Sequence, residues 1–178
     1  MVDARHYVAE HTLRNGSRVT IRAVRPDDRE RIARAFGQLD PDSVYTRFFT
    51  FKSELSDSDL ARLDAIDFVH EVMLVATVGP EADEIVIGSA RYVELDGTDD
   101  VRSAEVAFTV EEDYQGMGVA GRLLASLVAI AREAGFGRFE ADVLPGNKSM
   151  LAVFTRSGLP VLQRREDGVV HVALALPA

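Results

Sequence analysis

The chain contains no cysteine among its 178 residues. This absence excludes disulfide bonds, thiolate metal ligands and any reaction that passes through an acyl-cysteine intermediate. No run of apolar residues approaches the ~18 that a membrane-spanning helix needs, and the first residues lack the pattern of a secretory signal peptide. We therefore expect a cytoplasmic protein with no membrane partner.

Lysine is scarce, with two Lys against 18 Arg, and the basic residues lie scattered along the chain. Acidic residues exceed basic ones by 29 to 20, which gives a formal net charge of −9. A nucleic-acid-binding protein normally presents a basic face, so this composition argues against a nucleic-acid partner. An acidic surface instead favours a cationic partner, such as a lysine-bearing protein.

The length and composition fit one globular domain. With 47% hydrophobic residues, a chain of 178 residues can bury a core without a metal or disulfide to hold it together. No repeat, low-complexity segment or linker interrupts the sequence, so residues 1–178 are predicted to form a single domain. The His spacing of a metal site does not occur, and we predict no metal.

The first part of the chain is predicted to combine one hairpin with short helices. Asn15-Gly16 stands between two alternating segments, which is a strong hairpin signal. Helix starts are expected at Asp27, with Glu30 completing a capping box, at Asp40-Pro41, and at Ser56 with Asp59.

From residue 71 onward the pattern changes to strands. Segments 71–78, 84–95 and 102–110 are predicted to form an antiparallel meander. A helix over about 117–134 ends at Gly135, and it is followed by a strand at 138–144, a helix over about 148–157 and a hairpin at Asp167-Gly168. Strand 102–110, the long helix and strand 138–144 make a βαβ unit. The expected class is therefore α/β (α+β), a mixed and mostly antiparallel twisted sheet flanked by helices.

A glycine-rich loop joins the strand at 102–110 to the long helix. Gly116, Gly118 and Gly121 let the backbone approach a ligand closely, and the unpaired N–H groups of the first helical turn suit a pyrophosphate. The spacing also matches a dinucleotide-binding fingerprint. That alternative is disfavoured, because the loop comes late in the chain after an antiparallel meander, and Glu140 and Asp142 match the required acid only roughly.

The same loop resembles the acetyl-CoA signature of the GNAT acetyltransferase superfamily. Gln115, Gly118 and Ala120 fill its pattern of Gln or Arg, two residues, Gly, one residue, and Gly or Ala. The order of elements and the motif N-K-S-M-L-A-V-F-T-R-S-G-L at 147–159 agree with it. The segments R-x-V-R-P-D-D near the start, D-P-D-S-V-Y-T-R-F-F at 40–49 and A-E-V-A-F at 104–108 further resemble bacterial protein-lysine acetyltransferases.

This resemblance implies a GNAT fold and direct transfer of an acetyl group from acetyl-CoA to an amine, with Glu105 as the general base. A base is needed because freeing a lysine amine of pKa ~10.4 at neutral pH costs roughly 4–5 kcal/mol. Strand alternation puts Glu105 on one face with the small residues Ala107 and Thr109, which leaves space for a substrate beside it. The alternative is a glutamate at the sheet edge that simply faces water.

The resemblance also implies the cofactor contacts. The backbone of Phe108 and Val110 pairs with the pantetheine arm, and the backbone from Gly116 to Gly121, which includes Met117 and Val119, holds the pyrophosphate. Arg122 offsets phosphate charge or is a solvated surface residue. Asn147 contacts the cofactor, caps the last helix, or does both. Phe154 is also expected at the cofactor, where many members carry a Tyr acid, so either solvent protonates the departing CoA thiolate or no acid is needed.

The acceptor is the least defined part of this prediction. Tyr45, Arg47, Phe48 and Phe49 are expected to form its wall, although Phe48 and Phe49 also suit a core. His70 is either a proton relay or the end of a loop. The expected acceptor is a protein lysine, with an acyl-CoA-synthetase-type enzyme as the candidate protein. The alternatives are a small-amine or antibiotic acceptor, or an acyl-CoA-sensing module without activity; the oligomeric state stays open.

Overall fold

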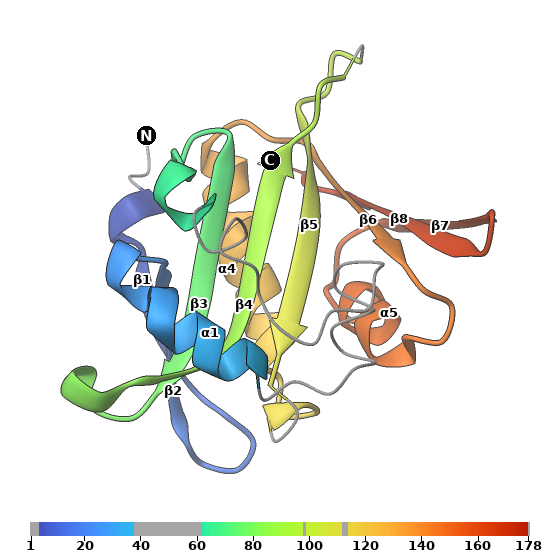
Figure 1. The fold of residues 1–178 in the computed structure, drawn as a ribbon. Coiled ribbons are helices and arrows are strands. Elements are labelled where there is room, and N and C mark those ends of the chain that lie inside the picture. The colour runs from blue at the N-terminus through green and yellow to red at the C-terminus, as the bar shows by residue number, and fades with distance from the viewer. Residues whose placement is uncertain (1–3, 38–61, 98, 112–113, 178) are drawn as a thin grey trace.

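The computed structural model describes residues 4–37, 62–97, 99–111 and 114–177. Within these ranges eight strands form one sheet in the order β1-β2-β3-β4-β5-β6-β8-β7 (Figure 1). Every neighbouring pair is antiparallel except β5 and β6, which are parallel. The predicted class, a mixed and mostly antiparallel sheet flanked by helices, is confirmed.

The elements follow the order expected from the sequence. The strands are β1 (Val8–Thr12), β2 (Arg18–Ala23), β3 (Glu71–Val78), β4 (Ile85–Glu94), β5 (Ser103–Val110), β6 (Arg138–Val143), β7 (Val161–Glu166) and β8 (Val169–Ala175). The α-helices are α1 (Arg29–Gly37), α4 (Val119–Glu133) and α5 (Lys148–Thr155). Short 3-10 turns are η1 (Ala4–His6), η2 (Pro26–Asp28), η3 (Arg62–Ala65) and η4 (Glu81–Asp83).

Both predicted hairpins are present. At the first, the Leu13 N–H donates to the Ser17 carbonyl at 2.8 Å, and Gly16 adopts a φ of 86°. At the second, Asp167 and Gly168 have φ values of 52° and 77°, the pair of left-handed residues that a tight type I′ turn requires.

The predicted βαβ unit is also present. Strand β5 leads through α4 to β6, and the two strands pair in parallel. Helix α4 begins at Val119 rather than 117, because Gly118 has a φ of 92° and lies outside the helical region as its N-cap. It ends before Gly135, whose φ of 88° stops the helix as expected.

The start of α1 differs from the prediction. Asp27 and Glu30 do not form the capping box; the chain first makes the turn η2, and the Asp28 carboxylate accepts the Arg25 N–H at 2.7 Å. Pro26 fixes that turn, which moves the capping carboxylate one residue along the chain. The helix starts predicted at Asp40-Pro41 and Ser56 lie outside the described residues.

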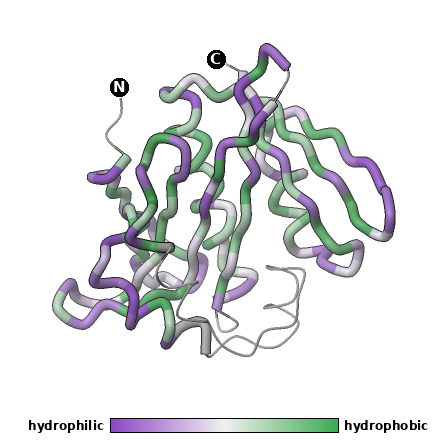
Figure 2. Tube along the Cα trace, turned by 45° about the horizontal axis from the view of Figure 1, so that its top comes forward, coloured by the Kyte–Doolittle hydropathy of each residue, from purple (hydrophilic) through white to green (hydrophobic). Residues whose placement is uncertain are grey.

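Two hydrophobic clusters hold helices on opposite faces of the sheet (Figure 1). The larger one includes Leu123 and Leu127 of α4 and Tyr92 of β4, all buried. The smaller one includes Met73 and Val75 of β3 and lies on the α1 side. Figure 2 shows the hydrophobic stretches along the central strands and hydrophilic ones at the ends of the hairpins. The sheet therefore separates an α4 face from an α1 face.

A buried ion network ties the base of α1 to the sheet. The Arg22 guanidinium donates two hydrogen bonds to the Asp28 carboxylate, at 2.7 and 2.8 Å, and also binds Glu84. The Asp28 side chain is completely buried. Burial alone would raise the pKa of Asp28, but hydrogen bonds from Arg22 and from the Arg25 N–H outweigh it, so the pKa is lowered overall.

We expect Asp28→Asn to destabilise the fold by about 3 kcal/mol, since it leaves part of the Arg22 charge buried without its partner. Because the pKa of Asp28 is lower in the folded than in the unfolded chain, its carboxylate stabilises the fold fully at pH values above the unfolded-state pKa. This stabilisation is lost as the pH falls through the folded-state pKa. Urea unfolding at pH 7 and at successively lower pH measures both effects. The exposed neighbour Asp27→Asn is the control, and equal unfolding midpoints for the two variants would contradict the expectation.

Candidate active site at the fork of the sheet

Strands β5 and β6 part soon after they begin. They pair only over Ser103–Glu105 and Arg138–Glu140, and then diverge (Figure 1). Beyond this point, within the described ranges, β5 pairs only with β4 and β6 only with β8. The result is a fork in the middle of the sheet, open between the second halves of the two strands.

The backbone of β5 presents unused hydrogen-bonding groups to this fork. The Leu95 N–H donates to Ser103 O at 2.9 Å, and the Glu111 N–H to Ile87 O at 2.7 Å, so the odd-numbered residues of β5 bond to β4. In an antiparallel ladder the alternate residues point the other way. Phe108 and Val110 therefore direct their N–H and C=O groups towards the fork, as an added strand would require.

Gln115 uses part of that edge. Its side-chain amide donates to the Val110 carbonyl at 3.1 Å, which fastens the loop to the end of β5. The Val110 N–H is not involved in this bond. Gln115 was predicted to contact the cofactor. In the structure its side chain also has a structural role, because it positions the loop.

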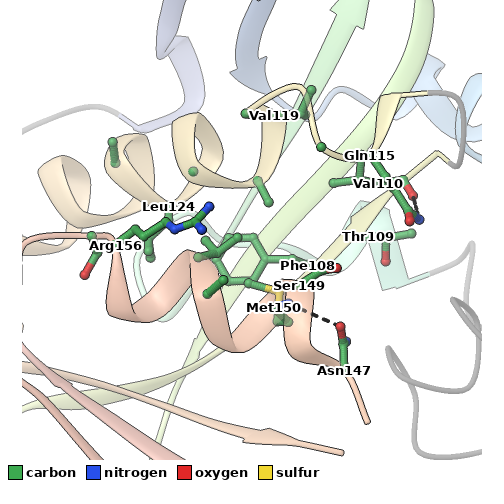
Figure 3. Close-up of a pocket in the computed structure, with 18 of the residues that line it drawn as sticks. Phe108, Thr109, Val110, Gln115, Val119, Leu124, Asn147, Ser149, Met150 and Arg156 are labelled. Atoms are coloured by element: carbon green, nitrogen blue, oxygen red, sulfur yellow. Dashed lines mark hydrogen bonds between the residues drawn. The ribbon is translucent and has the colours of Figure 1, made fainter. Parts of the chain in front are cut away.

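A groove of about 1380 Å³ runs from the loop along the space between α4 and α5 (Figure 3). Its walls include Val119 and Leu124 of α4, and Met150 and Val153 of α5. The N-terminus of α4 can sit against the sheet here because Gly88 has no side chain: a Cβ on Gly88 would lie 3.2 Å from Val119 Cγ1. The groove thus begins where the first turn of α4 meets β4.

The loop offers a backbone anion site at the mouth of the groove. Gly116 and Gly118 adopt φ values of 80° and 92°, conformations that favour glycine. No side chain caps α4, so N–H groups of its first turn remain available, and the helix dipole adds partial positive charge. A Cβ on Gly121 would meet no atom within 4 Å, so the groove is open beside this turn.

The charge of the groove is opposite to that of the whole chain. Among the described residues, its ionisable lining consists of four cations and one tyrosine, with no carboxylate: Arg14, Tyr114, Arg132, Lys148 and Arg156. Within the described ranges none of these four cations takes part in an ion pair. Figure 3 shows Arg156 reaching from α5 towards Leu124 of α4. Such a lining attracts an anionic ligand.

Most of the predicted cofactor residues come together in this groove. Those that line it are Phe108, Val110, Gln115, Gly116, Gly118, Val119, Ala120, Gly121 and Asn147. The Asn147 carboxamide oxygen accepts the Met150 N–H at 3.2 Å, so this residue is the predicted N-cap and lies at the groove as well. The geometry allows both roles.

Three predicted residues lie elsewhere. Met117 packs against the main core, and Arg122 is exposed on α4 outside the groove. The pKa of His11 on β1 is lowered, first by burial and then by the positive charge of Arg122. Arg122 therefore lies on the side of α4 near the N-terminal hairpin. Phe154 is 1% exposed and does not line the groove.

Phe154 supports the fork from inside the core. Its ring meets that of Phe108 edge-on, with centroids 6.0 Å apart. Helix α5 turns this residue inward, towards the sheet, so the predicted direct contact with a cofactor is corrected to a supporting role for the strand that carries Phe108.

Glu105 lies at the fork but on the other face of the sheet. Register partners share a face, and Ala107 is opposite Arg91, which in turn is opposite Met73 of the α1-side cluster. Glu105, two residues before Ala107, therefore faces the α1 side. Its carboxylate is exposed and, within the described residues, has no ion pair or hydrogen bond. The exposure matches the alternative of a glutamate that faces water, and the role of a base stays a prediction.

Two further predictions concern the acceptor side: a wall at residues 45–49 and a proton relay at His70. Tyr45, Arg47, Phe48 and Phe49 lie outside the described residues. His70 is exposed at the start of β3, with Nδ1 2.7 Å from an Asp67 carboxylate oxygen, and it does not line the groove. Its place agrees with the alternative that it ends a loop.

Sequence reasoning missed three of the groove cations. Arg132 could have been found, because Gly121, Ala125, Val128 and Arg132 follow helical spacing along one side of α4. Arg156 similarly follows from the last turn of α5. Arg14 has no local signal, since its neighbour in the groove, Gly116, is 102 positions away in the sequence.

The chain belongs to the GNAT acetyltransferase family. The family model described as an acetyltransferase (GNAT) domain matches residues 18–160, which include the fork, the glycine loop and α5. This confirms the predicted family. Among the described residues, no helix is long and apolar enough to cross a bilayer.

Two curated relatives match nearly all of this chain. Acetyltransferase Pat of Mycolicibacterium smegmatis is 33% identical over 165 residues, which cover 93% of this chain and 48% of Pat. Acetyltransferase PA5475 of Pseudomonas aeruginosa is 31% identical over 174 residues, covering 96% of this chain and 89% of that protein. The chain thus spans about half the length of Pat.

Solved structures agree with the fold. The GNAT domain of S. lividans PAT superimposes with a TM-score of 0.85 at 39% identity, covering 95% of this chain and 97% of that chain. The cAMP-binding acyltransferase from Mycobacterium smegmatis gives 0.66 at 30% identity, with 98% and 49% covered. The yncA protein of Salmonella typhimurium, solved with its cofactor acetyl-CoA, shares the fold at 0.70 and 21% identity, with 89% and 94% covered.

We expect Gly121→Glu to abolish most acetyl-CoA binding while leaving the fold intact. Replacing a helical glycine removes a destabilising residue worth about 0.5–1 kcal/mol, and an acid in the first turn suits the helix dipole. The same carboxylate would repel a pyrophosphate. Calorimetric titration with acetyl-CoA, beside thermal unfolding of the free protein, measures both.

Gly121→Gln is the matched control, because it fills the same space without charge. Tighter binding by the Gln variant than by the Glu variant is the expected charge effect. Wild-type affinity in Gly121→Glu would show that the anion site at this loop is wrongly assigned.

Proposed function

We propose that this protein transfers the acetyl group of acetyl-CoA directly to an amine, with Glu105 as the general base. The observation that carries the proposal is the fork: it is the place where a groove for an anionic cofactor on the α4 face meets a carboxylate on the α1 face. A donor lying in the groove and an acceptor approaching from the other face would meet there.

The residues of the groove suit acetyl-CoA. The outward-facing backbone of Phe108 and Val110 can pair with the amides of a pantetheine arm. The backbone of the loop from Gly116 to Gly121 can hold the pyrophosphate. The cations of the groove supply positive charge for the 3′-phosphate of CoA, and no carboxylate among the described lining residues opposes them.

In the proposed step, Glu105 takes the proton of the acceptor ammonium, directly or through one water. The freed nitrogen attacks the thioester carbonyl; a C–N bond forms, the C–S bond breaks, and the nitrogen releases its second proton to solvent to leave a neutral amide. The CoA thiolate leaves and is protonated by solvent, because the phenyl ring of Phe154 has no proton to give. A thiol of pKa near 8.5 makes this tolerable.

We propose a protein lysine as the acceptor. Glu105 and Glu140 are register partners at the fork, and the Glu140 carboxylate is paired with Arg138 at 3.3 Å, so that of Glu105 is the one without a partner among the described residues. An exposed carboxylate of this kind attracts a cationic side chain. The candidate acceptor protein is an acyl-CoA-synthetase-type enzyme, the proposed setting is the cytoplasm, and residues 1–178 are proposed to fold as one domain.

Glu105→Gln is expected to lower turnover by about 10²–10⁴-fold while acetyl-CoA affinity stays near the wild-type value, because the amide keeps the shape and cannot take a proton. Steady-state rates and calorimetric titration measure the two quantities. Glu140→Gln removes the adjacent carboxylate and should retain most activity. Loss of binding together with turnover in Glu105→Gln would contradict its role as a base.

The acceptor class is tested by thiol release from acetyl-CoA. The protein has no cysteine, so a thiol reagent detects only the CoA produced. We expect faster release with a purified acyl-CoA-synthetase-type protein than with free amines, and mass spectrometry should find the acetyl group on a lysine. Release with free amines alone would indicate a small-molecule enzyme, and binding without any release would indicate a sensor.

A further inference from the structure

The tip of the first hairpin reaches the glycine loop of the groove. Leu13 is buried in the main core and anchors the turn between β1 and β2. The next residue, Arg14, projects to the loop, where its Nη1 donates to the Gly116 carbonyl at 3.2 Å. Arg14 thereby becomes part of the groove lining, although it belongs to the opposite end of the chain.

The hydrogen bond to Gly116 leaves most of the Arg14 guanidinium unused. A guanidinium carries five N–H donors, and a neutral carbonyl does not compensate its charge. Within the described chain Arg14 has no carboxylate partner. Arg18, on the same hairpin, is instead paired with Glu10 at 3.5 Å and lies outside the groove.

We propose that Arg14 binds a phosphate group of the CoA moiety and so joins the N-terminal hairpin to the cofactor site. The inference rests on the proposed seat of the cofactor phosphates at the Gly116–Gly121 loop. Arginine suits this task because its planar guanidinium can donate two parallel hydrogen bonds to phosphate oxygens. The hydrogen bond to Gly116 holds the Arg14 guanidinium at the mouth of the groove before the ligand binds.

The test is the affinity of Arg14→Gln for acetyl-CoA, measured by calorimetric titration in low-salt buffer. Glutamine keeps a side-chain N–H donor for the Gly116 carbonyl and loses the charge, so a merely structural role would be largely preserved. We expect binding about tenfold weaker, the effect of losing one charged hydrogen bond. Arg18→Gln makes the same charge change on the same hairpin and should bind like the wild type.

Two further ligands identify the phosphate. Equal weakening for acetyl-CoA and its 3′-dephospho form would place Arg14 on the pyrophosphate; weakening for acetyl-CoA alone would place it on the 3′-phosphate. S-acetylpantetheine, which has no phosphate, should bind both proteins equally in an NMR titration. Unchanged affinity for acetyl-CoA, or equal loss for all three ligands, would overturn the inference. A wild-type protein that binds no acetyl-CoA would instead overturn the proposed function.

Discussion

The short parallel contact between β5 and β6 is the constraint on which the rest of the site depends. Only three residue pairs join the strands, and each strand is then held from its far side, β5 by seven pairs to β4 and β6 by six to β8. With each strand held in this way, the fork stays open between the described residues. Backbone polar groups left unpaired in such a gap need a partner. The backbone of Phe108 and the N–H of Val110 face this gap, where an extended ligand can use them, whereas the Val110 carbonyl already accepts the Gln115 amide.

The alternation of side chains along β5 places the groove residues on one face of the sheet and Glu105 on the other. Phe108 points with the even-numbered residues to the α4 face, where Phe154 supports it and the groove begins. Glu105 points with the odd-numbered residues to the α1 face, where no described residue neutralises it. A shift of one residue in the register of β5 would exchange these faces. The buried network of Arg22, Asp28 and Glu84 helps α1 stay on its own side.

The sequence allowed prediction of those features that depend on neighbours in the chain. The two tight turns, the glycine loop, the cap at Asn147 and the βαβ unit all follow from local spacing, whereas the base role of Glu105, taken from its motif, stays a prediction. Features that join distant segments could not be predicted. Arg22 meets Glu84 across 62 positions and Arg14 meets Gly116 across 102, and no periodicity connects such pairs. Phe154 was placed in the site by motif position, whereas the orientation of α5 buries it.

Charge distribution links the composition to the site. The chain has 29 acidic residues against 20 basic ones, yet the charged residues that line the groove within the described ranges are all cations. Elsewhere carboxylates hold arginines in pairs, such as Arg102 with Glu94 and Arg138 with Asp99. The described lining of the groove differs because it lacks carboxylates, not because the chain is rich in cations. An acidic chain can in this way attract an anionic ligand at one place.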